Sequence, residues 1–166
     1  MENDKDIEKM VREAVSSLVT KDTLDCKGVR VSDIPGVLEH SLLNPDTTKD
    51  MIAKGCQEAR KYRFANVVVA PYYVPFAVEQ LKGSAIKVCT AVGFPYGAAT
   101  TAGKVAEIKE AVANGAEEID VAMCYNAIKS GDIEYAVRDL ITCVDAAKRQ
   151  ATIKAIYEQG IYTEDE

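Results

Sequence analysis

Five short, mostly apolar runs, each followed by a stretch whose apolar residues recur every three or four positions, divide most of this chain into repeats. The runs occupy residues 36–43, 64–70, 86–92, 115–123 and 151–157. Strands that alternate with helices are typical of a parallel sheet, because each helix returns the chain to the edge where the next strand starts. The pattern therefore predicts an α/β fold, either an open parallel sheet or a barrel of βα units.

One carboxylate, Asp120, lies in the apolar middle of the fourth run, between Ile119 and Val121. An aspartate in a buried strand costs free energy unless it is hydrogen-bonded, paired or used in chemistry. If the strands close into a barrel, we expect Asp120 to point into its middle. Lys154 lies at the centre of the fifth run, and we expect it to line the same interior.

The stretches between the runs predict helices. Thr47 or Thr48 can cap the first of them, and a shorter helix is predicted over 74–81. Apolar stripes are predicted to face inward at Met51, Ile52, Cys56 and Ala59, at Val105, Ile108, Ala111 and Val112, and at Ile133, Val137, Leu140, Ile141 and Val144. The charged residues of the helix over 100–114 are predicted to form a solvated face, made by Lys104, Glu107 and Lys109.

The N-terminal part has a different design. Residues 5–19 place apolar side chains on one face of a predicted helix, and a polar linker follows up to residue 35. We therefore divide the chain into an amphipathic helix (1–20), a linker (21–35) and one barrel-like domain (36–166). The helix either packs on its own domain or docks on a partner. It resembles the encapsulation peptides that direct enzymes into bacterial microcompartments, which implies a shell protein as the partner of residues 5–19.

Composition excludes several classes of protein. The 20 Lys and Arg residues against 26 Asp and Glu residues give a formal charge of −6, which does not favour nucleic-acid binding. The chain has neither an apolar run of membrane-spanning length nor a signal peptide, so a cytoplasmic location is expected. The five cysteines form no Cys-x-x-Cys pair and His40 is the only histidine, so we expect reduced thiols and no metal site.

Four ordered blocks resemble one enzyme family. They read LEHSLLNPDTT (38–48), APYYVP (70–75), KVCTAVGFPYGAATT (87–101), and EID (118–120) together with AIKSGD (127–132). From about residue 36 to the end, the chain is similar to the deoxyribose-phosphate aldolases.

This resemblance implies a (β/α)₈ TIM barrel and a class I aldolase of deoxyribonucleotide catabolism. Such an enzyme joins acetaldehyde to glyceraldehyde 3-phosphate through a lysine Schiff base and uses no metal or other cofactor. Asp120 matches the proton-relay aspartate of the family. Glu39 and Ser41 replace the usual Asp and Thr around His40, so they are expected to contact substrate, with altered specificity. Family members are often dimers, so the resemblance allows a homodimer.

The departures from the family are equally informative. The Schiff-base lysine of the family lies on the sixth strand in a Lys-Thr-Ser-Thr-Gly motif, and a helper lysine precedes a Pro-Ala-Gly-Gly-like turn on the seventh. Neither motif occurs in these 166 residues. Lys154 aligns with a different family lysine, so it is expected to line the substrate pocket. This chain alone is therefore predicted to have no aldolase activity.

The sequence leaves three functions open. The first is an aldolase that this sequence represents incompletely, with two open sheet edges and an apolar inner face. The second is a non-catalytic cargo or interaction module that docks through its N-terminal helix. The third is a complete flavodoxin-like domain for a phosphorylated ligand, although the chain has neither a Gly-x-Gly-x-x-Gly sequence nor a Walker loop.

Overall fold

The computed structural model describes residues 31–164, which form one parallel sheet of five strands. The strands are β1 (Glu39–Leu42), β2 (Asn66–Val69), β3 (Lys87–Val92), β4 (Glu118–Ala122) and β5 (Thr152–Ile156). They pair in chain order, from β1 to β5. A flavodoxin-like sheet has the order 2-1-3-4-5, whereas sequential pairing is the order of a βα barrel. The prediction of five barrel-type βα units is confirmed.

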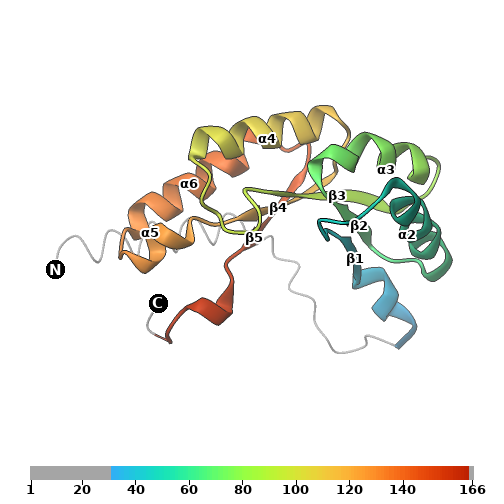
Figure 1. Ribbon diagram of the computed structural model, residues 1–166, viewed down its shortest axis with the longest axis horizontal. Helices are drawn as coiled ribbons and strands as arrows, with labels where there is room; N and C mark the ends of the chain where they lie inside the picture. The colour runs from blue at the N-terminus through green and yellow to red at the C-terminus, as the bar shows by residue number, and fades with distance from the viewer. Residues whose placement is uncertain (1–30, 165–166) are drawn as a thin grey trace.

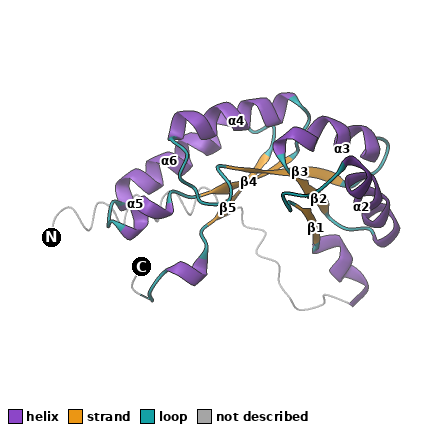
Figure 2. Cartoon of the chain, viewed as in Figure 1, coloured by secondary structure: helices purple, strands orange, loops and turns teal. Residues whose placement is uncertain are grey.

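Residues 31–164 contain five α-helices and three short 3₁₀ helices. They are α2 (Lys49–Tyr62), α3 (Val74–Leu81), α4 (Thr101–Ala113), α5 (Tyr125–Lys129) and α6 (Ile133–Ala146), with short 3₁₀ helices η1 (Val31–Val37), η2 (Pro71–Tyr73) and η3 (Gln159–Ile161). Figure 1 shows α2, α3, α4 and α6 as an arc over the convex side of the sheet. These four helices leave the concave side of the sheet uncovered (Figure 2).

The hydrophobic core lies between the sheet and this arc. Alternate strand residues point to the helices, and they pack with apolar residues of α2, α3, α4 and α6. The strand members of this core are Val67, Val69, Val88, Val92, Ile119 and Val121. Because this core uses only one face of each strand, the other set of alternate residues is left for the concave face.

One glycine fixes the loop between β3 and α4. Gly97 has a positive φ of 62°, and a Cβ added there would lie 1.6 Å from the backbone oxygen of Met123. Only a residue without a side chain permits this approach. The loop is thereby held against the carboxyl end of β4.

Several details differ from the sequence-based expectations. Met51 and Ile141 were predicted to face inward, but they are 42% and 37% exposed. Small residues such as Cys143 occupy the buried face of α6 instead, because they let the helix approach its neighbours closely. Lys104 was predicted on a solvated face, yet it is fully buried. It forms an ion pair with Asp139 of α6, with 2.7 Å between Nζ and Oδ2.

The short elements η1 and α5 were not predicted. The 3₁₀ helix η1 occupies the end of the proposed linker, and α5 follows β4 directly. Five or seven residues are too few to show a helical period in sequence. The predicted helix over 5–19 lies outside the described residues. Within 31–164, no helix is both long enough and apolar enough to span a membrane.

Candidate active site

The concave face of the sheet carries the predicted site residues. Asp120 and Lys154 are direct partners in the register of β4 and β5, and side chains of paired residues in neighbouring strands point to the same face. Their neighbours Ile119 and Ile153 pack with the core on the opposite face. The expectation that Asp120 points into the hollow of the curved sheet is therefore confirmed.

Lys154 of β5 joins three carboxylates from two other strands, β1 and β4. Its Nζ lies 3.0 Å from Asp120 Oδ1 and 3.4 Å from Glu118 Oε2, and it donates a hydrogen bond to Glu39 Oε1. Glu39 belongs to β1 and Lys154 to β5, which are the two edges of the sheet. This ion pair therefore spans the concave face from one edge to the other.

A second set of polar contacts supports these carboxylates. The buried Asn66 of β2 donates one hydrogen bond to Glu39 Oε1 at 2.8 Å and another to Glu118 Oε2 at 2.7 Å. Lys87 of β3 donates to Glu118 Oε1 at 2.7 Å. The inner face was predicted to be apolar, and this is wrong. All five strands contribute to one hydrogen-bonded network, which we call the lumen network (Glu39, Asn66, Lys87, Glu118, Asp120 and Lys154).

Hydrogen bonds within the lumen network shift the pKa values of Lys154 and Glu118. Partial burial opposes the positive charge of Lys154, but its hydrogen bonds to Glu39 and Asp120 outweigh this effect and raise its pKa. Burial also opposes the negative charge of Glu118, while hydrogen bonds from Lys87 and Asn66 lower its pKa below the ordinary value. Lys154 is therefore a stable ammonium, which is the wrong protonation state for a nucleophilic amine.

Three of the four predicted site residues lie together in the structure, and Ser41 makes no hydrogen bond with them. Glu39, Asp120 and Lys154 are in direct contact. Ser41 lies on the same face of β1 as Glu39, but it makes no hydrogen bond to the lumen network within the described part of the chain. Among residues 31–164, no group of three or more His, Cys, Asp or Glu side chains is placed to hold a metal ion.

Three members of the network were missed by sequence reasoning. Glu118 could have been found, because it lies two residues before Asp120 and strand residues two apart share a face. Asn66 and Lys87 begin β2 and β3, where a polar residue looks like the end of a strand. Their role depends on contacts across strands, which a single run of sequence does not contain.

Acid should weaken the fold through Glu118. The pKa of Glu118 is lower in the folded chain than its ordinary value of 4.5. The ionised carboxylate therefore adds to the free energy of unfolding above pH 4.5, and this contribution is lost as the pH falls through the lowered pKa. We expect Glu118→Gln to lower the free energy of unfolding by about 1–2 kcal/mol at pH 7, since charge-assisted hydrogen bonds are lost. The difference in free energy of unfolding between Glu118→Gln and the parent chain should become smaller in acid.

Urea unfolding at several pH values measures this effect. Glu110→Gln, at an exposed position of α4, is the matched control and should change stability little. A Glu118→Gln chain with the same stability and the same acid sensitivity as the parent would contradict the assignment.

Comparison with known proteins places this geometry in a family. No family model matches the chain. A deoxyribose-phosphate aldolase from Brevibacillus brevis is 46% identical over 129 residues, which cover 78% of this chain and 58% of the relative. One from Geobacillus sp. is 44% identical over 135 residues, covering 81% and 60%. The chain belongs to the deoxyribose-phosphate aldolase family. It spans about three fifths of the length of these curated relatives.

Solved structures of similar proteins agree with the aldolase fold. A candidate deoxyribose-phosphate aldolase from Coccidioides immitis superposes with a TM-score of 0.82 at 31% identity, over 97% of this chain and 64% of the other. The deoxyribose-phosphate aldolase from Aeropyrum pernix, described as tetrameric, gives 0.74 at 26% identity, over 81% and 56%. The five described βα units therefore match part of the TIM barrel of the aldolase family.

Proposed function

We propose that this chain supplies the first five βα units of a deoxyribose-phosphate aldolase. The enzyme would interconvert 2-deoxyribose 5-phosphate with acetaldehyde and glyceraldehyde 3-phosphate through a lysine Schiff base. The observation that carries the proposal is the Asp120 carboxylate on the concave face, 3.0 Å from the Lys154 ammonium. Two homologous relatives named for this activity support it.

Asp120 is proposed as the proton-transfer residue. It lies in the middle of β4 and faces the hollow of the curved sheet, and the active sites of such barrels lie at the carboxyl end of this hollow. Lys154 donates to one of its oxygens, which restricts the orientation of the carboxylate. In the proposed reaction Asp120 moves a proton through water to or from the carbon next to the Schiff base. Glu39 and Ser41 are proposed to contact the phosphorylated sugar.

Lys154 is not proposed as the Schiff-base lysine. A nucleophilic lysine must be neutral, whereas hydrogen bonds to Glu39 and Asp120 overcome partial burial and raise the pKa of Lys154. The Lys-Thr-Ser-Thr-Gly motif that supplies the family nucleophile is absent from the 166 residues. We therefore propose that Lys154 positions Glu39 and Asp120, and that the 166-residue chain alone has no aldolase activity.

Borohydride trapping tests this assignment. The chain is mixed with acetaldehyde and glyceraldehyde 3-phosphate, reduced with borohydride, and digested for mass spectrometry. We expect no substrate-derived mass on Lys154 above the level of Lys109, an exposed lysine of α4 that serves as the control. A specific adduct on Lys154, absent from Lys109, would show that Lys154 is the nucleophile.

The finer predictions about cellular context stay predictions. A cytoplasmic location, a homodimer, and docking of residues 5–19 on a microcompartment shell protein each extend beyond the described contacts. The non-catalytic alternative, in which this helix is the working part, depends on the same residues. The flavodoxin-like alternative is not favoured, because the strand order is sequential.

A further inference from the structure

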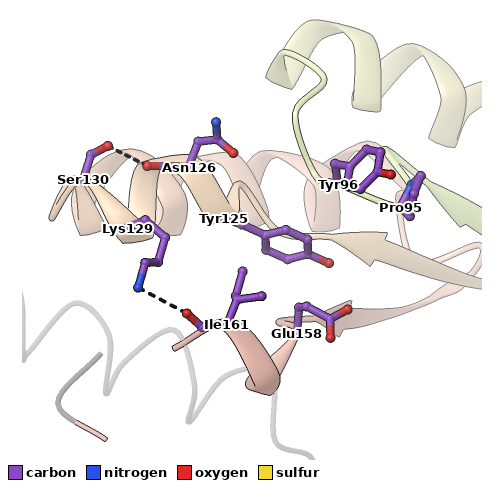
Figure 3. Close-up of a pocket in the computed structure, with 8 residues that line it drawn as sticks. All are labelled: Pro95, Tyr96, Tyr125, Asn126, Lys129, Ser130, Glu158 and Ile161. Atoms are coloured by element: carbon purple, nitrogen blue, oxygen red, sulfur yellow. Dashed lines mark hydrogen bonds between the residues drawn. The ribbon is translucent and has the colours of Figure 1, made fainter. Parts of the chain in front are cut away.

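A pocket lies apart from the lumen network, at the carboxyl ends of β3, β4 and β5. It has a volume of about 620 Å³ and is walled by the loops that follow these strands. Figure 3 shows the Tyr125 ring extending from the start of α5 toward Glu158, with Tyr96 on one side and Ile161 on the other. None of the six lumen-network residues lines this pocket.

Among the described residues, the hydroxyl group of Tyr125 has no hydrogen-bond partner. The residue is only 6% exposed, and within the described chain its buried hydroxyl makes no hydrogen bond. Leaving a buried hydroxyl unpaired costs free energy, and phenylalanine would fill the same space without that cost. Such a group in a folded protein calls for a specific explanation. A ligand that bonds to the hydroxyl provides one.

Glu158 supplies a second unused group at the same place. Its carboxylate forms no hydrogen bond or ion pair with the described residues, and it lines the pocket with Tyr125. Burial, and then the nearby charge of Glu158, raise the pKa of Tyr125. The phenol is therefore protonated at neutral pH and can donate a hydrogen bond, while the carboxylate can accept one.

The remaining groups of the pocket select against an anion. The cation of the pocket, Lys129, already donates to the backbone oxygen of Ile161 at 3.2 Å and lies 5.9 Å from the ring centroid of Tyr162. A phosphate would meet the carboxylate of Glu158. The aromatic faces of Tyr96 and Tyr125 can pack against the C–H groups of a ligand.

We propose that this pocket binds a small neutral polyhydroxylated ligand, a sugar or polyol. Its carbon skeleton packs against Tyr96 and Tyr125. One hydroxyl accepts a hydrogen bond from the Tyr125 phenol, and another donates to the Glu158 carboxylate. The inference goes beyond the proposed aldolase activity: the pocket lies at the carboxyl ends of the strands, as the active sites of βα barrels do, but none of the residues assigned to that reaction lines it.

Two-dimensional NMR of the ¹⁵N-labelled full chain tests the proposal. D-ribose is the neutral probe, and D-ribose 5-phosphate is its charged counterpart. We expect ribose to shift the amide signals of residues 125–130 and 158–161, and the phosphate ester to bind there more weakly. Tyr125→Phe should reduce ribose affinity about tenfold, which is the typical contribution of one hydrogen bond with a charged or well-placed partner.

Controls separate binding from folding. Tyr72→Phe changes a phenol that is 74% exposed and lies outside the pocket, so ribose affinity should be unchanged. Without ligand, Tyr125→Phe should melt at the same temperature as the parent chain or higher, because no hydrogen bond is lost. The proposal is overturned if ribose shifts none of these amide signals, or if the phosphate ester binds more tightly than ribose. It is also overturned if the Tyr125→Phe chain binds ribose as tightly as the parent chain, or if the Tyr125→Phe chain melts at a lower temperature than the parent.

Discussion

Replacing Lys104 with alanine is expected to lower the free energy of unfolding by about 3–5 kcal/mol, the loss typical of breaking a buried ion pair. Lys104 and Asp139 are 0% and 2% exposed, and the two side chains link α4 to α6. The second oxygen of Asp139 accepts from Thr101 at 2.7 Å. Without the ammonium, the carboxylate stays buried, and within residues 31–164 the Thr101 hydroxyl is its one remaining hydrogen-bond donor.

Urea unfolding followed by circular dichroism measures the loss. Lys109→Ala, at an exposed position of the same helix, should change the free energy of unfolding by less than about 0.5 kcal/mol. The double replacement Lys104→Met with Asp139→Leu should recover most of the stability, because apolar residues of similar volume remove the unpaired charge. A Lys104→Ala chain that is as stable as the Lys109→Ala chain would contradict the account.

The sequence pattern predicted the sheet because strand signals are local. Each apolar run identified a strand to within a few residues, and the helix over 74–81 was predicted at its observed bounds. Thr48 caps α2, with its hydroxyl accepting from the Met51 amide. The parallel arrangement followed from the alternation, since neighbouring parallel strands need a long crossover connection, which is usually a helix.

The packing faces of the helices were harder to predict. Apolar periodicity assigned Lys104 to solvent because a lysine is rarely buried without a partner. That partner, Asp139, lies 35 positions along the chain on another helix. Neither helix alone contains the information that the two charges meet. The same limit explains why the inner face was expected to be apolar.

Long-range contacts also complete the candidate site. Glu39 and Lys154 are separated by 115 positions and meet only because the curved sheet brings its two edges within reach. Sequence reasoning placed both in the interior but left them unconnected. Asp120 was recognised because a carboxylate inside a strand is conspicuous, whereas the partner that holds it became visible only in the folded chain.

The largest functional effect is expected from Asp120 in a complete barrel. Residues 36–158 of this chain can replace the corresponding part of the Brevibacillus brevis relative, to which this chain is 46% identical over 129 residues. We expect this hybrid to cleave 2-deoxyribose 5-phosphate. Asp120→Asn should then lower kcat by about 10²–10⁴-fold, the usual contribution of a positioned proton-transfer group. Asparagine keeps the size of aspartate but cannot exchange a proton.

Asp145→Asn is the matched control, because Asp145 is an exposed residue of α6 and its replacement should leave kcat unchanged. The decisive measurement is the rate of glyceraldehyde 3-phosphate release by the hybrid and by these two variants, with folding checked by circular dichroism. The account predicts an active hybrid that loses activity only with Asp120→Asn. A folded hybrid without activity, or a folded Asp120→Asn variant that releases product as fast as the hybrid, would contradict it.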